Sequence, residues 1–298
     1  MSKVHGGWLV AKTLHELGVR EIFSLSGGHI NPIYDACIDF NIRIIDTHHE
    51  QGAAMAADAY GRVKRQPGIC LVTAGPGLSN AITGIAGAYL SNAPCLILSG
   101  KSGIEENDRI PLQDIDQLSI VNPITKWART VFDTRRIPDY ITTAYKKAIT
   151  GRPGPVYLEM PYEILYGSCN EDEVDRYNTT LPYYKPEAAK EAVAEAVEML
   201  KSSKRPVVIA GSGAWYSGAD GELLRFIDRV KIPVFTLNFG RGIVSDDHPL
   251  CFGAGSPSAP NAFKRVTSEA DLIILLGIRL SIYIGWGRTF NPEAKIIQ

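Results

Sequence analysis

Cysteine is scarce in this 298-residue sequence, and the few cysteines follow no pairing pattern. There are five of them, an odd number without a C-x-x-C pair, at positions 37, 70, 95, 169 and 251. A disulfide framework needs paired cysteines, and a structural zinc site needs them at close spacing, so the sequence argues against both. We expect reduced thiols in a cytoplasmic protein and no metal ligands within this chain.

Excess charge of one sign and long hydrophobic runs are also missing. The 31 Lys and Arg nearly balance the 32 Asp and Glu, which gives a formal net charge of -1. Nucleic acids and membrane surfaces usually require a basic patch, so neither is expected as a partner. No apolar run approaches the ~18 residues of a membrane span. With 45% hydrophobic and 21% charged residues, the composition is that of a soluble globular protein.

Continuous apolar stretches alternate with amphipathic ones along the chain. Stretches such as GICLV are typical of buried strands in a parallel sheet, and the stretches between them have helical spacing. We therefore predict an α/β protein with two open, mostly parallel, doubly wound domains at 1–165 and 187–298. The acidic and then aperiodic stretch 166–186 is predicted to be a linker. Residues 294–298 resemble the start of a buried strand, so we expect the native polypeptide to continue.

Several motifs that would indicate other functions are absent. No G-x-G-x-x-G is followed by a well-placed acid, which argues against a nicotinamide dehydrogenase. The P-loop pattern G-x-x-x-x-G-K-[ST] does not occur, and neither does the nucleophile elbow G-x-S-x-G. A P-loop NTPase and a serine hydrolase therefore have little support.

Glycine-rich turns follow three of the predicted strands, at 24–29, 73–80 and 210–215. Open α/β sheets bind ligands at the carboxyl ends of their strands, although glycine also serves simply to make tight turns. Two ionisable residues accompany these turns. His29 lies within the first turn, and Glu50 begins an alanine-rich helix, where the helix dipole favours an acid even without a catalytic role.

Four stretches, in this order, resemble the thiamine-diphosphate enzymes related to acetohydroxyacid synthase. They are GGHINPIYDACIDFNIRIIDTHHEQGAAMAADAYGR, VTAGPGLSNAITGIAGAY, LQDIDQLSIVNPITKWA and GRPGPVYLEMP. Within this family the chain is most similar to benzaldehyde lyase and to acetolactate-synthase-like 2-hydroxyacyl-CoA lyases. The resemblance covers essentially the whole chain. It implies a pyrimidine-binding domain at 1–165 and a Rossmann-like, nucleotide-binding middle domain at 187–298.

The resemblance also implies roles for individual residues. Glu50 would hydrogen-bond a ring nitrogen of the cofactor's aminopyrimidine and favour the imino form that deprotonates the thiazolium carbon. A carboxyl group with little water around it is suited to sharing a proton with such a nitrogen. Gln113 would face the reacting carbon. His29, which matches a histidine of benzaldehyde lyase, would act as acid and base on the substrate hydroxyl. The other implied cofactor-binding residues are Gly27, Gly28, Thr73, Gly75, Pro76, Gly77 and Asn80.

Two features limit what can be transferred from the family. Benzaldehyde lyase has a second histidine where this chain has Ser26, so its substrate preference does not carry over as a whole. Arg152 matches an arginine that contacts flavin in acetohydroxyacid synthases, but relatives keep this segment without flavin. FAD, ADP and no nucleotide at all therefore stay open as alternatives for the second domain.

A cofactor-binding element of the family is missing from the sequence. The family binds the diphosphate and Mg²⁺ through a G-D-G…N motif in a third domain, and no GDG occurs here. We expect such a domain to be supplied by the same polypeptide or by a second chain. We also expect a homodimer or homotetramer, in which a second pyrimidine-binding domain is present.

These inferences predict a thiamine-diphosphate-dependent carboligase or lyase that makes or breaks a C–C bond next to a carbonyl. The presence of His29 favours a 2-hydroxyacyl-CoA or benzoin-type lyase. An acetolactate synthase is the alternative, and oxalyl-CoA decarboxylase is more distant. The alternative of another class is a non-catalytic, nucleotide-binding or regulatory α/β subunit.

Overall fold

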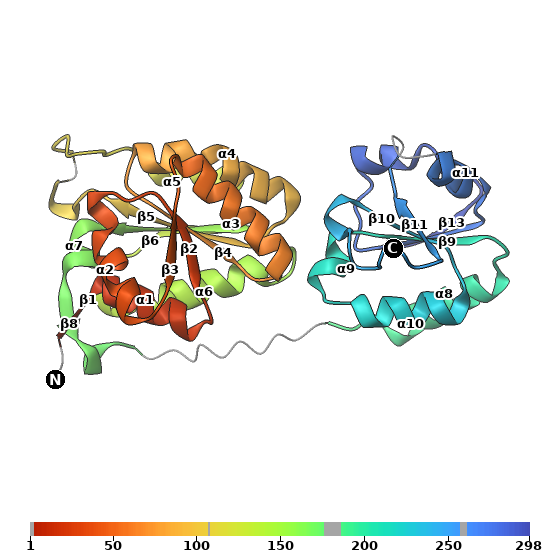
Figure 1. Cartoon of the computed structure of the whole chain (residues 1–298), viewed down its shortest axis with the longest axis horizontal. Coiled ribbons are helices and arrows are strands. Elements are labelled where there is room, and N and C mark those ends of the chain that lie inside the picture. The colour runs from red at the N-terminus through yellow and green to blue at the C-terminus, as the bar shows by residue number, and fades with distance from the viewer. Residues whose placement is uncertain (1–2, 107, 176–185, 257–260) are drawn as a thin grey trace. The chain divides into compact units, whose positions relative to one another are not determined.

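The chain consists of two compact units, Met1–Pro182 and Tyr183–Gln298, each built around one parallel sheet (Figure 1). The computed structural model describes residues 3–106, 108–175, 186–256 and 261–298. Both units have the predicted architecture of strands alternating with helices. The expectation of two mostly parallel α/β domains is therefore confirmed.

The sheet of the first unit has six parallel strands in the order β3-β2-β4-β5-β7-β6. Its central strands are buried almost without interruption, as expected for a parallel sheet covered on both faces. The strands are β2 (Glu21–Ser24), β3 (Arg43–Asp46), β4 (Gly68–Val72), β5 (Cys95–Lys101), β6 (Ala128–Thr130) and β7 (Pro155–Pro161).

Helices cover both faces of this sheet, and each face has its own hydrophobic core. One core contains residues of α1 (Gly6–Glu16), α2 (Asn31–Asp39) and α6 (Ile137–Ile149). The other contains residues of α3 (Glu50–Lys64), α4 (Pro76–Ser91) and α5 (Gln117–Val121). Figure 1 shows α1 and α4 on opposite faces of the sheet.

Small residues let α3 pack closely on its neighbours, as its alanine-rich sequence suggests. A Cβ added at Gly84 of α4 would lie 2.5 Å from the Cβ of Ala54. A Cβ added at Gly68, at the start of β4, would lie 1.9 Å from the carbonyl oxygen of Ala57. Larger side chains at these contacts would push α3 away from the sheet and displace its first residue, Glu50.

Part of the predicted linker belongs to the first unit. β8 (Ser168–Asn170) pairs antiparallel with β1 (Lys3–His5), and α7 (Tyr162–Tyr166) precedes it. The prediction that 166–186 is a linker was therefore wrong for this strand, because three residues are too short to show a strand pattern. The part of the linker at 176–185 lies outside the described residues.

The second unit has a five-stranded parallel sheet in the order β11-β10-β9-β12-β13. Its two cores lie between the sheet and the helices on either face, with α8 and α10 contributing to one and α11 to the other. The last strand falls within the predicted stretch 294–298. The elements are α8 (Lys190–Ser202), β9 (Pro206–Ala210), α9 (Ser212–Tyr216), α10 (Asp220–Val230), β10 (Val234–Thr236), β11 (Cys251–Ala254), α11 (Asn261–Glu269), β12 (Leu272–Leu276) and β13 (Lys295–Ile297).

Three further findings concern thiols, membrane spans and metals. All five cysteines are free. Within the described residues, no helix has the length and apolar content required to cross a membrane. The same part of the chain contains no group of three or more His, Cys, Asp and Glu side chains that could hold a metal ion.

Candidate active site at the carboxyl end of the first sheet

The loops after β2 and β4 leave neighbouring strands in opposite directions. The two strands pair side by side, yet the first loop leads to α2 on one face and the second leads to α4 on the other. Ligands of open α/β sheets bind at such a divergence point, beyond the carboxyl ends of the strands. Most of the residues that the sequence suggested for the site lie on these loops or at the helix starts beside them.

Glu50 is the first residue of α3, and it is only 7% exposed. The helix begins here because His49 caps it, accepting a hydrogen bond from the N–H of Gln51 through Nδ1 at 3.1 Å. Glu50 Oε2 accepts a hydrogen bond of 3.0 Å from Asn80 Nδ2. Its Oε1 faces Gly77, where an added Cβ would lie 3.7 Å away. No described residue donates a hydrogen bond to Oε1, so this oxygen can accept one from a ligand.

Thr73 joins the loop after β4 to the loop after β2. Its Oγ1 lies 3.2 Å from His29 Nδ1, and a Cβ added at Gly27 would lie 2.5 Å from Thr73 Cβ. On β5, a Cβ at Gly100 would lie 2.4 Å from His29 Cβ. Glycine at these two positions is therefore needed for the close packing around the imidazole. Gly28 differs, because an added Cβ would meet nothing within 4 Å, which leaves open space beside its backbone.

The surroundings of His29 favour the neutral form of its imidazole. Burial lowers the pKa of His29, and the charge of Glu106 raises it by a smaller amount. The Thr73 hydroxyl also lies 3.5 Å from Gln113 Oε1. When its single proton points to Gln113, the Thr73 oxygen accepts from the Nδ1–H of His29, and the lone pair of the ring is on Nε2. In that tautomer Nε2 can accept a proton from a substrate hydroxyl.

The Gly75-Pro76-Gly77 turn connects β4 to α4. Gly75 has φ 59° and ψ −109°, a region that only glycine occupies without strain. A Cβ on Gly75 would lie 2.4 Å from the carbonyl oxygen of Gln113, and one on Gly77 would lie 2.8 Å from Thr73 Cγ2. Pro76 opens the helix, where its fixed φ is already suitable. The turn therefore contacts the Gln113 loop on one side and Thr73 on the other.

With one exception, the predicted site residues lie together at this edge of the sheet. The exception is Arg152, whose Nε donates a hydrogen bond to Asn92 Oδ1 at the end of α4. This position precedes β7 and lies at the amino end of the strands, opposite Glu50. The residues that lie together are Gly27, Gly28, His29, Glu50, Thr73, Gly75, Pro76, Gly77, Asn80 and Gln113.

Sequence reasoning missed Gln117, the first residue of α5. It is 1% exposed, and its Oε1 accepts a hydrogen bond of 2.7 Å from the N–H of Gly75. Its Nε2 donates to the carbonyl oxygen of Gly100 at 3.1 Å and to Glu159 Oε2 at 2.9 Å. Gln117 lies within the motif LQDIDQ, but nothing in that motif indicates that its amide is buried. A short helix of five residues gives no periodicity from which burial could be predicted.

Sequence reasoning also missed α7, which contacts two loops of the site. The hydroxyl of Tyr166 donates a hydrogen bond of 2.7 Å to the carbonyl oxygen of Gly28. Glu163 Oε2 accepts a hydrogen bond of 3.0 Å from the N–H of Ile104, in the loop after β5. Burial raises the pKa of Tyr166, so the hydroxyl keeps its proton and stays a donor at neutral pH. Through these bonds α7 stabilises the loops that precede His29 and Gln113.

We expect Tyr166→Phe to raise the pKa of His29 towards its ordinary value. Without the hydroxyl, the Gly28 carbonyl is released, and water reaches an imidazole whose pKa is lowered by burial. The measurement is an NMR pH titration of the His29 ring in this chain. Tyr162→Phe is the matched control, because Tyr162 stacks on Tyr166 at 4.1 Å but its hydroxyl bonds to no described residue. An unchanged His29 pKa in Tyr166→Phe would contradict this role.

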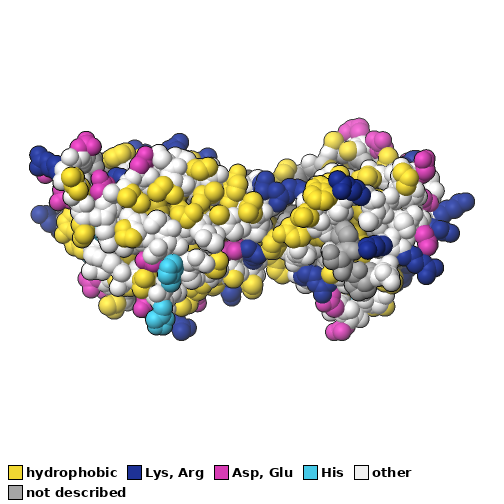
Figure 2. All heavy atoms as spheres, turned by 90° about the horizontal axis from the view of Figure 1, so that it is seen from above, with side chains coloured by type: hydrophobic (Ala, Val, Ile, Leu, Met, Phe, Trp, Pro, Cys, Tyr) yellow, Lys and Arg dark blue, Asp and Glu magenta, His cyan; other side chains and the backbone are white. Residues whose placement is uncertain are grey.

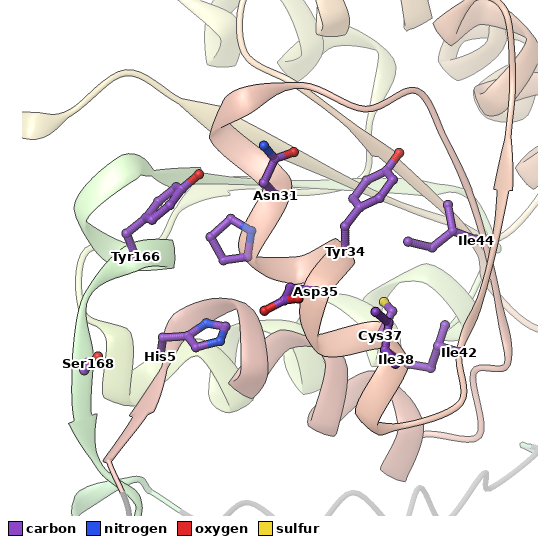
Figure 3. A pocket seen from close by; sticks show the side chains of 11 residues that line it. His5, Asn31, Tyr34, Asp35, Cys37, Ile38, Ile42, Ile44, Tyr166 and Ser168 are labelled. Carbon is purple, nitrogen blue, oxygen red and sulfur yellow. The ribbon is translucent and has the colours of Figure 1, made fainter.

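A groove of about 940 Å³ lies outside α2, next to the edge strand β3 (Figure 3). Figure 3 shows Tyr166 reaching towards the start of α2 beside Asn31, so the groove ends next to the loop that carries His29. Its other end is apolar and includes Ile38 and Ile44. The groove is separate from the Glu50 side chain, which does not line it.

The second unit has a glycine-lined divergence point of its own. The loops after the paired strands β9 and β12 approach so closely that the N–H of Gly213 donates a 3.0 Å hydrogen bond to the carbonyl oxygen of Gly277. Gly277 has φ 61°, and a Cβ added to it would lie 2.4 Å from the Ala214 nitrogen. A Cβ at Gly240 would lie 2.7 Å from the carbonyl carbon of Gly211. Side chains are excluded here, as in sites where backbone contacts a phosphate group.

Figure 2 looks onto the face of the first unit that carries α4 and α5, where hydrophobic side chains are spread over the surface. The hydrophobic residues exposed on these two helices are Tyr89, Leu90 and Ile120. In the loop that carries Gln113, Leu112 is 76% exposed. Hydrophobic residues grouped on one face mark a surface suited to contact with another protein domain.

Comparisons with known proteins agree with this arrangement. Residues 4–120 match the family described as thiamine pyrophosphate enzyme, N-terminal TPP binding domain, and residues 193–298 match the corresponding central domain. The probable acetolactate synthase large subunit of Methanocaldococcus jannaschii is 38% identical over 300 residues, which are 98% of this chain and 50% of that protein.

Two other relatives show similar coverage, and one of them is named for a different activity. The acetolactate synthase large subunit of Lactococcus lactis is 38% identical over 296 residues, 98% of this chain and 50% of that protein. The 2-hydroxyacyl-CoA lyase 2 of Caenorhabditis elegans is 33% identical over 329 residues, 99% of this chain and 50% of that protein. The chain thus spans about half the length of the curated relatives it matches. It belongs to the thiamine pyrophosphate enzyme family, of which it carries the N-terminal and central domains.

Proposed function

We propose that this chain supplies the aminopyrimidine-binding half of a thiamine-diphosphate-dependent enzyme that makes or breaks a C–C bond next to a carbonyl. The observation that supports it best is the buried Glu50 carboxylate, with one oxygen bonded to Asn80 and the other left for a ligand beside Gly77. A carboxylate in such a place needs a partner, because burying an unsatisfied charged group is costly. A hydrogen-bond donor on a flat ring would satisfy it.

The residues at this edge fit an aminopyrimidine ring in shape as well as in polarity. Glycine at 28 leaves open space where a side chain would otherwise lie, Gly77 packs closely on Thr73, and Glu50 offers an acceptor beside Gly77. Bound thiamine diphosphate would supply the carbanion chemistry at the substrate carbonyl carbon. Glu50 would hold a proton at its free oxygen, Asn80 would fix the orientation of the carboxylate, and His29 would move a proton at Nε2.

For the substrate, we favour a 2-hydroxyacyl-CoA or a benzoin-type 2-hydroxy ketone. The support is His29, a neutral base held by Thr73 and placed to take the proton of a substrate hydroxyl. Acetolactate synthesis from pyruvate is the second candidate, and it is supported by the relatives that share 38% identity. The two candidates differ in whether the reaction depends on a base at position 29.

We infer that a diphosphate-binding domain completes the site and holds Mg²⁺. The support is that relatives are about twice as long as this chain, and that hydrophobic residues lie exposed on α4, α5 and the Gln113 loop. We propose a homodimer or homotetramer for the same reason, since paired domains would cover that face. The free cysteines support a place in the cytoplasm, where thiols stay reduced.

We also propose that the second unit binds a nucleotide, either FAD or ADP. The support is the glycine-lined point between β9 and β12, where Gly211, Gly213 and Gly277 pack so closely that no side chain fits, as in loops whose backbone contacts a phosphate group. Arg152 would take part only if the two units bring it to the flavin. Equilibrium binding of ADP and of FAD to this chain tests the proposal, and Gly213→Val should abolish binding of either nucleotide.

Turnover of three substrates by the complete enzyme tests the main proposal. The assay supplies thiamine diphosphate and Mg²⁺, with pyruvate, a 2-hydroxyacyl-CoA or benzoin as substrate. We expect cleavage of one of the last two to be the fastest reaction, and His29→Ala to slow it by at least 10-fold. Acetolactate as the main product, with little effect of His29→Ala, would favour the second candidate. Absence of thiamine-diphosphate binding would overturn the proposal.

A further inference from the structure

Gln117 connects the ends of three neighbouring strands through one buried amide. Its oxygen accepts from the N–H of Gly75 after β4, and its nitrogen donates to the carbonyl oxygen of Gly100 on β5 and to Glu159 on β7. The side chain is 1% exposed, so water cannot replace these bonds. An amide provides two donor hydrogens and an acceptor oxygen, and here each of them has a partner.

The partners of Gln117 leave only one orientation for its amide. The N–H of Gly75 must face the oxygen, because a backbone N–H can only donate. The carbonyl oxygen of Gly100 and the carboxylate of Glu159 must face the nitrogen, because both accept. A flipped amide would set donor against donor and acceptor against acceptor, so the side chain is held in one state.

Glu159 fixes the other end of this connection. It is 1% exposed and accepts hydrogen bonds from Thr130 Oγ1 at 2.6 Å and from Gln117 Nε2. Lys101 Nζ lies 3.4 Å from Glu159 Oε1 and supplies the opposite charge. A buried carboxylate with this many partners does not move readily, because each bond would have to break without water to replace it.

We propose that Gln117 is a positioning residue for the candidate active site, which holds the Gly75 turn in the conformation that places Gly77 beside Glu50. The hydrogen bond to the Gly75 N–H is the direct link, and the bonds to Gly100 and Glu159 fix the amide that makes it. Its effect on the cofactor depends on the function proposed above. Its effect on the turn does not, because that follows from this chain alone.

Gln117→Leu tests the link, because leucine fills a similar volume without any polar atom. We expect the Gly75 amide to exchange its hydrogen about 10-fold faster relative to core amides of β5, as measured by NMR in this chain. In the complete enzyme, we expect the apparent KM for thiamine diphosphate to rise about 10-fold, with kcat lowered less than 3-fold. Unchanged exchange at Gly75 would overturn the proposal.

A pair of reciprocal substitutions separates positioning from general loss of stability. Gln117→Glu alone places two carboxylates against each other, whereas Gln117→Glu with Glu159→Gln restores a donor facing an acceptor and keeps an acceptor for Gly75. The Gly100 carbonyl oxygen loses its donor in both variants. We therefore expect the double variant to recover part of the Gly75 protection lost in the single one. Failure of the double variant to recover it would count against the proposal, and this test remains if Gln117→Leu does not fold.

Thr130→Val is the matched control for the network. It removes the 2.6 Å bond to Glu159 without touching the Gly75 turn. We expect it to lower stability while leaving relative Gly75 exchange and the KM for thiamine diphosphate unchanged. Suppose that Gln117→Leu speeds hydrogen exchange at the Gly75 amide but that the wild-type enzyme binds no thiamine diphosphate. The proposed function then fails, and the role of Gln117 in the turn stands. If Thr130→Val and Gln117→Leu speed hydrogen exchange at the Gly75 amide equally, the positioning role of Gln117 is overturned.

Discussion

Glu50→Gln should lower turnover of the complete enzyme by at least 100-fold while leaving the fold intact. The substitution replaces an acid that can exchange a proton by an amide of the same shape that cannot, and general acid–base groups typically contribute 10²- to 10⁴-fold. Folding should survive, because the glutamine oxygen can still accept the hydrogen bond from Asn80. The lost charge at the first turn of α3 costs only about 0.5 kcal/mol. Steady-state kinetics and thermal unfolding, measured on the same preparation, check both halves of this expectation.

Asp58→Asn is the matched control for Glu50→Gln. It makes the same carboxylate-to-amide change on the same helix, at another buried acid, which pairs with Arg62. Asp58 lies two turns further along α3, away from Asn80 and Gly77. We expect activity within about 3-fold of wild type and a stability loss of about 1 kcal/mol from the weakened pair. Equal losses of activity in the two variants would mean that helix stability, rather than chemistry at Glu50, controls turnover.

Many of the strands and helices can be predicted from local residue patterns in the sequence. The run GICLV predicts β4 because parallel strands covered on both faces are apolar throughout. The start of α3 at Glu50 and its end near Lys64 agree with the alanine-rich pattern. The antiparallel pair β1 and β8 could not be predicted in this way. It joins residues 3–5 to residues 168–170, and its stability comes from a contact between distant segments.

The candidate site likewise contains residues that the sequence reveals and residues that only the structure reveals. Glycine turns and ionisable residues at the ends of strands are visible in the sequence, which is why His29, Glu50 and Gly75 could be named. Gln117 and Tyr166 could not, because their contribution depends on contacts across 42 and 138 positions of the chain. No local pattern indicates which of many polar side chains will meet a backbone group of a distant loop. Residues that position others are therefore the part of a site that needs a structure.

Gly75→Ala should lower the free energy of unfolding of the first unit by about 2 to 4 kcal/mol. Gly75 has φ 59° and ψ −109°, so any side chain at this position is strained. The added Cβ would also lie 2.4 Å from the carbonyl oxygen of Gln113, so the loop that carries Gln113 must shift. Urea unfolding of this chain, followed by circular dichroism, measures the loss without any cofactor. In the complete enzyme, the same shift should lower turnover by at least 10-fold, because Gln113 would no longer face the site.

Gly87→Ala supplies the comparison, because it makes the same substitution on the helix that the turn begins. Gly87 lies inside α4, and a Cβ added there would meet nothing within 4 Å. Alanine is favoured over glycine in a helix interior by about 1 kcal/mol, so this variant should be as stable as wild type or more stable. The opposite signs of the two effects distinguish the backbone requirement at Gly75 from a general intolerance of α4 to alanine. If Gly75→Ala unfolds at the same urea concentration as wild type, the turn does not need glycine, and the placement of Gln113 and Gly77 around it must be wrong.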